Sequence, residues 1–385
     1  MTKRLEGLKM QSKGIYIRSK IIILLITLIY FPSLYLYAQI TTKIDSQVAL
    51  SQPLTIKWLY ESELTINLTP ATDGERIYLP LTAGLLVSLQ AADGQLLWKT
   101  DLGGELSASP IADESSVYVA SETVGDPATA PHANGALRAL GREGGITLWM
   151  RTLPMPIRGS LVANEINLFG GSTDGRVYAV RKKTGDIAWV TQHSAPFASH
   201  PAIFGANLYI GSNDGTLFSL NQSTGKVNWR YRTRGAIRGQ AIVVKGVVYF
   251  GSADGYVYAV READGRLRWQ RRTGAGVQTV TFAENGVLVA SLDNFVYLLS
   301  FNEGDRLWKR LLAGRIAAEP LTSPDGVLFT PLSSSTGVVL DLRDGKQLNS
   351  IPIGEDNSLA ASPIVAGKVL FITTRHGLLA FSRPG

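Results

Sequence analysis

The sequence predicts an all-β protein, an eight-bladed β-propeller built from four-stranded antiparallel blades, and three periodic markers support this prediction. The seven tryptophans follow one another at intervals of 40, 51, 40, 40, 40 and 39 residues, and all but the first have a glycine four residues earlier. The pattern G-S-x-D-G-x-(V/L)-(Y/F) begins at Gly171, Gly211 and Gly251. An apolar residue also stands four positions before a proline, as Phe197 does before Pro201. A period of about 40 residues is typical of propeller blades.

Each repeat unit is expected to contain four short strands. Within residues 237–272, β-branched and aromatic residues concentrate in the ranges 237–243, 246–251, 256–260 and 267–272. The pairs Lys245-Gly246, Asp254-Gly255 and Asp264-Gly265 separate these ranges, and such pairs supply the positive φ that a tight hairpin needs. No useful length of the repeat region shows the apolar period of a helix.

The number of blades follows from the tryptophan positions. The seven repeat tryptophans are Trp58, Trp98, Trp149, Trp189, Trp229, Trp269 and Trp308. An eighth slot follows Gly345, and Asn349 stands there in the tryptophan position. Because Trp58 precedes the first full unit and the last unit has only three strands, we expect residues 55–60 to complete the last blade and to leave no open sheet edge. The propeller is then expected over residues 54–385, preceded by a linker over residues 39–53.

Residues 1–38 are expected to be a signal peptide or an N-terminal membrane anchor. They hold six basic residues and one acidic residue, and an uncharged apolar run over residues 21–37 follows Lys20. Basic residues, an apolar run and a small residue such as Ala38 form the layout of a secretory signal. The 17 apolar residues are also just long enough to span a bilayer. In both cases the chain after them lies outside the cytoplasm. We therefore expect an exported protein in the periplasm or cell envelope, in contact with a membrane only through this segment.

Charge and composition exclude several classes of function. Of the formal net charge of +7, residues 1–38 carry +5, so the remaining 347 residues are nearly neutral and nucleic acid is not an expected partner. The chain has no cysteine, which excludes disulfides, thiolate metal sites and a lipid-modified cysteine. The four histidines show no metal-ligand spacing. The repeated Asp-Gly pairs are interpreted as hairpin turns rather than as a carboxylate array. No catalytic or metal-ligating residue is predicted.

The repeat also contains the pattern V-Y-A-V/L-x-x-x-(T/D)-G-x-x-x-W, as in residues 177–189 and 257–269. This pattern resembles the PQQ-type (quinoprotein-like) β-propeller repeat over roughly residues 54–385. The resemblance implies that the repeat tryptophans pack between neighbouring blades. The family contains quinone-dependent dehydrogenases and cofactor-free scaffolds, among them the propeller lipoprotein of the outer-membrane β-barrel assembly machinery. This chain lacks the lipidated cysteine of that lipoprotein.

The resemblance alone leaves both an enzyme and a scaffold open, and the residues favour the scaffold. The enzymes of the family need Ca²⁺ held by acidic and amide side chains, an aspartate base, a tryptophan beneath the quinone and usually a vicinal disulfide. Here the disulfide is impossible and every tryptophan belongs to the repeat. We expect no enzyme activity and no cofactor, but a monomeric scaffold for protein partners in the cell envelope, acting in outer-membrane protein assembly. The alternatives are a PQQ-dependent oxidoreductase and a membrane-anchored sensor of a small ligand.

One face of the ring is expected to be polar where the innermost strands begin. Alignment of these strands places two sets of polar side chains on the same side, two residues apart along the strand. The resulting candidate channel and partner face consists of Arg158, His200, Arg238, Gln240, Gln278 and Glu319. Two interpretations are open: a water-filled channel, or contact with a ligand or partner through Arg158, Arg238 and His200. The only large insertion, residues 121–134, is expected on this face.

Basic residues also flank the repeat tryptophans in the outermost strands. They are Lys99, Arg151, Arg230, Arg232, Arg271, Arg272, Lys309 and Arg310. Charge on an outermost strand discourages edge-to-edge association. An anionic-partner patch is the alternative interpretation.

Overall fold

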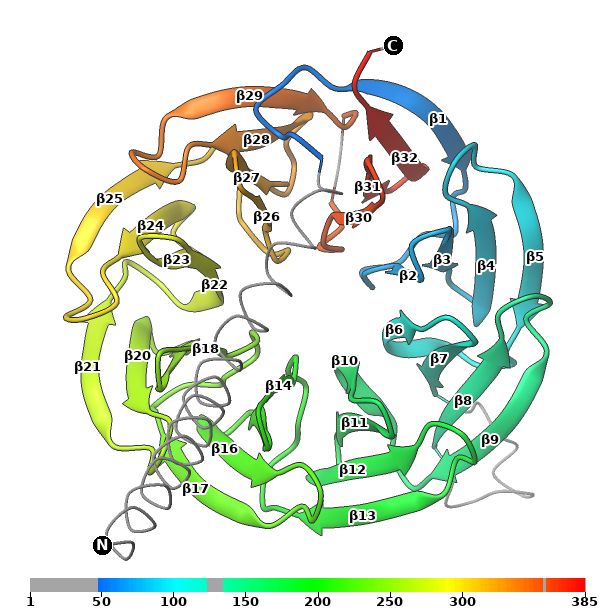
Figure 1. Cartoon of the computed structure of the whole chain (residues 1–385), viewed down its shortest axis with the longest axis horizontal. Helices are drawn as coiled ribbons and strands as arrows, with labels where there is room; N and C mark the ends of the chain where they lie inside the picture. The colour runs from blue at the N-terminus through cyan, green and yellow to red at the C-terminus, as the bar shows by residue number, and fades with distance from the viewer. Residues whose placement is uncertain (1–47, 123–133, 356–357, 385) are drawn as a thin grey trace, which may run out of the picture. The chain divides into compact units, whose positions relative to one another are not determined.

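The computed structural model describes residues 48–122, 134–355 and 358–384. These residues form 32 β-strands and no helix, which confirms the all-β prediction (Figure 1). The expected signal peptide or anchor, and residues 39–47 of the expected linker, lie outside the described residues. Among the described residues there is no helix with the length and hydrophobicity needed to cross a membrane.

The strands form six four-stranded sheets and one eight-stranded sheet. In chain order, their bounds are β1 Thr55–Glu61, β2 Ala71–Thr72, β3 Arg76–Pro80, β4 Leu85–Gln90, β5 Leu96–Asp101, β6 Leu106–Ala112, β7 Ser116–Ser121, β8 Gly135–Gly141, β9 Thr147–Leu153, β10 Ile157–Ala163, β11 Asn167–Ser172, β12 Arg176–Arg181, β13 Ile187–Gln192, β14 Ala202–Phe204, β15 Asn207–Gly211, β16 Thr216–Asn221, β17 Val227–Arg232, β18 Ile242–Val244, β19 Val247–Gly251, β20 Tyr256–Arg261, β21 Leu267–Arg272, β22 Val277–Ala283, β23 Gly286–Ser291, β24 Phe295–Leu299, β25 Arg306–Leu311, β26 Leu321–Ser323, β27 Gly326–Phe329, β28 Thr336–Leu340, β29 Gln347–Pro352, β30 Ile364–Ala366, β31 Val369–Thr374 and β32 Gly377–Ser382.

The eight-stranded sheet consists of two four-stranded units joined by a short parallel pairing, in which Ser160 of β10 lies opposite Ser109 of β6. Divided there, the described strands give eight antiparallel units, which we number as blades 1 to 8 from β2–β5 onward. Blade 8 contains β30, β31 and β32, and β1 pairs antiparallel with β32 as its outermost strand. The N-terminal strand therefore closes the ring as predicted, and Figure 1 shows the blades around a common centre.

Strand direction divides the connections between two faces of the ring. Neighbouring strands in a blade are antiparallel, so connections alternate between the faces. The segments that lead into the innermost strands share one face with the hairpins between second and third strands, and we call this the entry face. The hairpins that follow the first and third strands lie on the opposite face, the exit face.

The repeat tryptophans join neighbouring blades. Trp229 of β17 packs on Gly265 of the next blade, where an added Cβ would lie 2.6 Å from the indole. Gly265 also has a φ of +69°, so both the close approach and the backbone conformation require glycine. The indole Nε1 donates a hydrogen bond to the Glu262 carbonyl at 2.7 Å. All seven tryptophans make the same two contacts with the next blade.

The apolar core lies between the blades rather than inside any one of them. At the junction of blades 4 and 5, Tyr209 and Leu217 pack with Val248 and Phe250, all of them buried. Corresponding clusters occur around the ring. Because each sheet buries both of its faces against neighbours, no blade has a complete core of its own.

The junction between blades 7 and 8 differs from the other seven. Blade 8 takes its outermost strand from the start of the chain, so no hairpin there can offer a glycine to the residue at the tryptophan position. Residues 48–52 fill that place. Asn349 Nδ2 donates to the carbonyl oxygens of Leu50 and Gln52, at 3.0 and 2.7 Å. The carboxylate of Asp325 accepts hydrogen bonds from the backbone N–H groups of Leu50 and Ser51.

The assignment of residues 48–53 to a linker therefore needs correction. Val48 and Leu50 are buried in the apolar cluster of blades 7 and 8, together with Leu54. This segment has no repeat marker because it replaces a hairpin.

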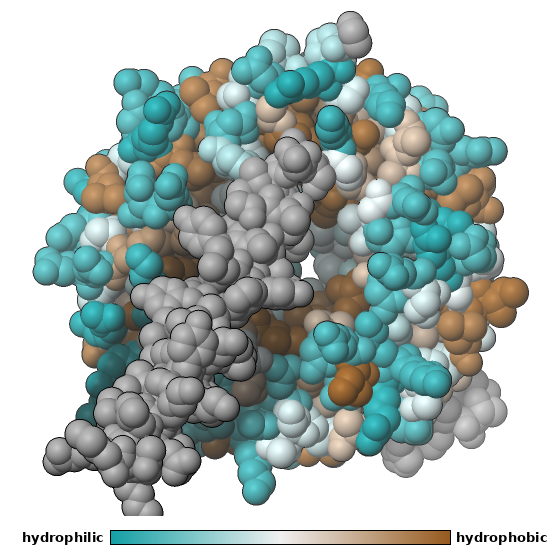
Figure 2. Space-filling view, viewed as in Figure 1, coloured by the Kyte–Doolittle hydropathy of each residue, from teal (hydrophilic) through white to brown (hydrophobic). Residues whose placement is uncertain are grey.

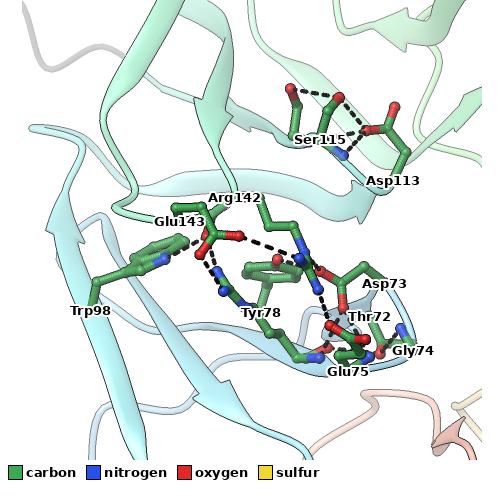
Figure 3. A network of polar contacts seen from close by, with 12 residues as sticks. Thr72, Asp73, Gly74, Glu75, Tyr78, Trp98, Asp113, Ser115, Arg142 and Glu143 are labelled. Carbon is green, nitrogen blue, oxygen red and sulfur yellow. Dashed lines mark hydrogen bonds and ion pairs between the residues drawn. The ribbon is translucent and has the colours of Figure 1, made fainter.

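Polar contacts on the exit face connect blades 1 and 2 (Figure 3). The side chain of Asp73 is buried and accepts hydrogen bonds from Arg142 and from the Tyr78 hydroxyl, while Arg142 also pairs with Glu75 and Glu143. Burial alone would raise the pKa of Asp73, but these hydrogen bonds outweigh it and lower the pKa. The pairs Asp113–Lys182 and Asn164–Gln222 make corresponding contacts at the next two junctions.

Three of the basic residues in the outermost strands have a structural role that the sequence did not suggest. Arg151, Arg271 and Arg310 each lie two residues after a repeat tryptophan. Each donates through Nε to the carbonyl oxygen of the glycine beneath that tryptophan. In Figure 2, hydrophilic and hydrophobic residues are interspersed around the rim of the ring.

Replacing Trp229 with alanine should destabilise the protein by about 3–5 kcal/mol, because it removes a large buried side chain between two blades. Chemical denaturation at equilibrium measures this difference. The matched control, alanine at the exposed Arg268 of the neighbouring outermost strand, should change stability by less than about 0.5 kcal/mol. Equal effects of the two substitutions would contradict the packing described here.

Leu50→Ala should lower the free energy of unfolding by about 2–5 kcal/mol, since Leu50 is fully buried although it precedes the first strand. Gln52→Ala serves as the control because its side chain is exposed and only its carbonyl contacts Asn349. A Leu50→Ala protein as stable as the wild type would mean that residues 48–52 act as a simple linker.

Candidate functional site

A cavity of about 270 Å³ lies where the innermost strands begin, on the entry face of the ring. All eight blades contribute residues to it, through segments just before or near the start of their innermost strands. Its lining consists of Asn67, Leu68, Thr69, Ser109, Gly159, Ala198, His200, Arg238, Gly239, Gln278, Thr279, Ala317, Glu319, Ala360 and Ser362. Blades 2 and 3 contribute one residue each, Ser109 and Gly159. The lining therefore comes from the entire circumference of the ring.

Four of the six predicted site residues line this cavity: His200, Arg238, Gln278 and Glu319. The other two lie outside its lining. Gln240 donates a hydrogen bond to the Pro201 carbonyl at 3.3 Å and so connects blades 5 and 4. Arg158 forms an ion pair with Glu122, which lies at the start of the insertion.

The expected insertion on this face is described only at its ends. Ser121 closes β7, Glu122 follows it, and Asn134 precedes β8. Residues 123–133 lie outside the described residues. The contact between Glu122 and Arg158 places the start of the insertion beside the first residues of β10.

His200 and Glu319 meet across the channel. His200 belongs to blade 4 and Glu319 to blade 7, and His200 Nδ1 lies 3.3 Å from Glu319 Oε1. Burial alone would lower the pKa of His200, but the contact with Glu319 outweighs it and raises the pKa. Burial likewise disfavours the Glu319 carboxylate, and the contact with His200 nevertheless lowers the pKa of this carboxyl. Both shifts favour a protonated histidine beside an ionised glutamate.

Hydrogen bonds between successive blades hold the cavity wall. The backbone N–H of Thr69 donates to Ser109 Oγ, that of Ser362 to Thr69 Oγ1, and that of Glu319 to Ser362 Oγ. Gln278 Nε2 donates to the Ala317 carbonyl, so the wall continues from blade 7 to blade 6. In each of the first three bonds the side-chain oxygen serves as the acceptor.

Asn67 and Thr69, which contribute to this wall from blade 1, are not among the site residues predicted from the sequence. The signal for them was present. Ile66 and Pro70 carry the apolar-to-proline marker, and Thr69 directly precedes Pro70 as His200 precedes Pro201. Extending the strand alignment to blade 1 would have added both residues.

Arg238 is the unpaired charge of the cavity. It is exposed and makes no ion pair or side-chain hydrogen bond with any residue that the structure describes. The other charged groups of the lining, His200 and Glu319, face each other. With His200 protonated, the lining therefore carries one net positive charge.

The residues present do not fit a quinone held by Ca²⁺. The seven repeat indoles pack between blades and donate to backbone carbonyls, so none lies beneath a ligand in the cavity. Glu319 is the only acidic residue of the lining, and it faces His200. Over the described ranges, no group of three or more histidine, aspartate or glutamate side chains is arranged to hold a metal ion.

Known proteins share both the sequence pattern and the fold. The chain matches the family described as outer membrane protein assembly factor BamB over residues 46–129, 133–278 and 235–384. The curated outer membrane protein assembly factor BamB of Shewanella oneidensis is 30% identical over 132 residues. These residues are 33% of this chain and 30% of that protein, so the match spans less than a third of the relative.

Solved structures show the similarity of fold. BamB from Moraxella catarrhalis matches with a TM-score of 0.71 and 16% identity, over 86% of this chain and 99% of that chain. The quinohemoprotein alcohol dehydrogenase from Comamonas testosteroni matches with a TM-score of 0.68 and 12% identity, over 86% and 77% of the two chains. At these identities the likeness concerns the fold alone.

The His200–Glu319 pair should make stability depend on pH. Its stabilisation through His200 is complete below the ordinary histidine pKa of 6.5 and is lost as pH rises through the raised pKa of the folded protein. Its stabilisation through Glu319 is complete above the ordinary value of 4.5 and is lost as pH falls through the lowered pKa. The stability difference between wild type and the His200→Gln/Glu319→Gln variant should therefore be largest between pH 4.5 and 6.5. Urea denaturation from pH 4 to 9 measures it, and a pH-independent difference would refute the pair.

Proposed function

Because the chain belongs to the family of outer membrane protein assembly factor BamB, we propose that it is an exported, non-catalytic propeller scaffold that binds protein partners during outer-membrane protein assembly. The observation that carries this proposal is the family match, which extends over nearly all of residues 46–384. The name of the Shewanella oneidensis relative states the same role for that protein.

The construction of the ring suits a scaffold. Seven indole–glycine contacts and the polar contacts of the exit face fix each blade against the next. A stiff ring of this kind holds its surface loops in constant relative positions, and binding residues commonly lie on such loops. The partner would then meet a preformed surface with little ordering cost on the scaffold side.

We assign the partner surface to the entry face. It holds the cavity with the unpaired Arg238, the Arg158–Glu122 ion pair, and both described ends of the only large insertion. On the exit face, the ion pairs Asp73–Arg142 and Asp113–Lys182 serve as contacts between blades. Arg238 is therefore the residue of the cavity lining whose charge is available to a partner.

Residues 1–38 provide the route to the envelope in this proposal. Their six basic residues and apolar run give the chain a signal peptide or an inner-membrane anchor, and either one delivers residues 48–384 outside the cytoplasm. The propeller itself is proposed to act as a monomer, because its closed ring leaves no unpaired strand between first and last blade.

Partner capture tests this function. Tagged full-length protein, expressed in its own envelope and extracted with mild detergent, should recover a component of the outer-membrane protein assembly machinery, identified by mass spectrometry. Charge reversal on the entry face with Arg158→Glu and Arg238→Glu should reduce the recovery severalfold, because the reversed charges repel an acidic partner surface.

The matched control reverses two basic residues of the rim, Arg230→Glu and Arg272→Glu, both of them exposed in outermost strands. This control should recover the partner at the wild-type yield. Recovery that falls only with the rim variant would move the binding surface to the rim. Absence of any assembly component from the wild-type capture would reject the scaffold function itself.

A further inference from the structure

We propose that the entry-face cavity is a binding site for a carboxylate group, a ligand site beyond the scaffold role. The inference rests on the balance of hydrogen-bond donors and acceptors in the lining, on its charge and on its size. Each of these is a property of described residues.

The wall hydrogen bonds use acceptor atoms and leave donors free. Asn67 Oδ1 accepts from the backbone N–H of Ala360 at 2.7 Å, and the hydroxyl oxygens of Thr69, Ser109 and Ser362 accept from other backbone N–H groups at 3.0 Å. An amide nitrogen still has two hydrogens to donate, and each hydroxyl has one. None of these hydrogens has a partner among the described residues. The lining is therefore rich in unused donors.

The charge of the lining also favours an anionic ligand. The Arg238 guanidinium offers up to five N–H donors and pairs well with the two oxygens of a carboxylate. Glu319, the one carboxylate of the lining, is neutralised by His200 at 3.3 Å. An anionic ligand therefore meets one uncompensated positive charge and no uncompensated negative charge.

The size of the cavity limits the ligand. About 270 Å³ is slightly below the usual range of small-molecule pockets, so the site accommodates a small acid or the end of a peptide rather than a large cofactor. The shared chemistry is a carboxylate, which either a free dicarboxylic acid or the C-terminus of a partner chain supplies. The two sources are separated by the choice of probe.

The site should also respond to pH. His200, Arg238 and Glu319 are the titratable and charged groups of the lining. When His200 loses its proton, the pair with Glu319 becomes negative and opposes a bound carboxylate. Affinity for a carboxylate should therefore fall as pH rises through the raised pKa of His200.

Isothermal titration calorimetry of the purified protein tests the site with matched probes. Succinate is compared with succinamide, and acetyl-Ala-Ala-Ala as the free acid with its C-terminal amide. We expect at least one acid to bind and its amide not to bind. Arg238→Gln should weaken acid binding by about tenfold or more, since it removes a charged hydrogen bond. The control Arg234→Gln, an exposed residue of the same connection outside the lining, should leave the affinity within about twofold.

The outcomes distinguish the two sources of the carboxylate, and they distinguish failure of the carboxylate site from failure of the scaffold function. Binding of succinate identifies a free small acid as the ligand, and binding of the peptide acid alone identifies a chain terminus. Equal binding of acid and amide, equal effects of the two arginine variants, or no binding of either acid would overturn the proposal. Partner capture by the wild-type protein is a separate experiment. Failure of the carboxylate proposal would therefore not reject the scaffold function. Arg238→Gln should melt like the wild type, because the exposed Arg238 side chain makes no hydrogen bond or ion pair with the described residues.

Discussion

The contact between an indole of one blade and a glycine of the next is the interaction on which this propeller depends. A Cβ at Gly265 would stand within 2.6 Å of the Trp229 ring, so the glycine admits the indole and the indole then excludes any larger residue. The same loop offers a backbone carbonyl to the indole N–H, at 2.7 Å for Trp229. Because both halves of the contact recur with the repeat, blades that lack cores of their own become stable only as neighbours. The cavity wall follows from this arrangement, since it is built from one short segment of each blade.

The closing junction shows how the same constraint is met without the usual residues. A ring closed by the N-terminal strand lacks one hairpin, and Asn349 replaces the missing indole with an amide that reaches Leu50 and Gln52. The Asp325 carboxylate also holds this segment in place, because it accepts hydrogen bonds from the backbone N–H groups of residues 50 and 51. Closure therefore depends on residues 48–52, which lie shortly after the segment proposed to direct export, residues 1–38. In the proposed function, delivery of the chain and completion of its fold involve adjacent stretches of sequence.

The fold could be predicted because its determinants are local and repeated. The tryptophans, the glycines and the Asp-Gly turns each occupy a fixed position in a repeat of about 40 residues. Because they recur at this period, a single sequence is enough to identify them. The role of residues 48–53 could not be predicted, because that segment occurs once and its partners, Asp325 and Asn349, are far away in sequence. The candidate site was predicted in part. Strand alignment placed four residues in the cavity, whereas the meeting of His200 with Glu319 depends on the width of the channel, which no local pattern encodes.

In the proposed function, a rigid ring presents its entry face to a protein of the outer-membrane assembly machinery. Site-specific photo-crosslinking in the intact envelope tests this contact, with a photoreactive amino acid at Ala198 in the cavity lining or at Arg268 in an outermost strand. We expect crosslinks from position 198 to an assembly component and none from position 268. Crosslinks from position 268 alone, or to no envelope protein from either position, would contradict it.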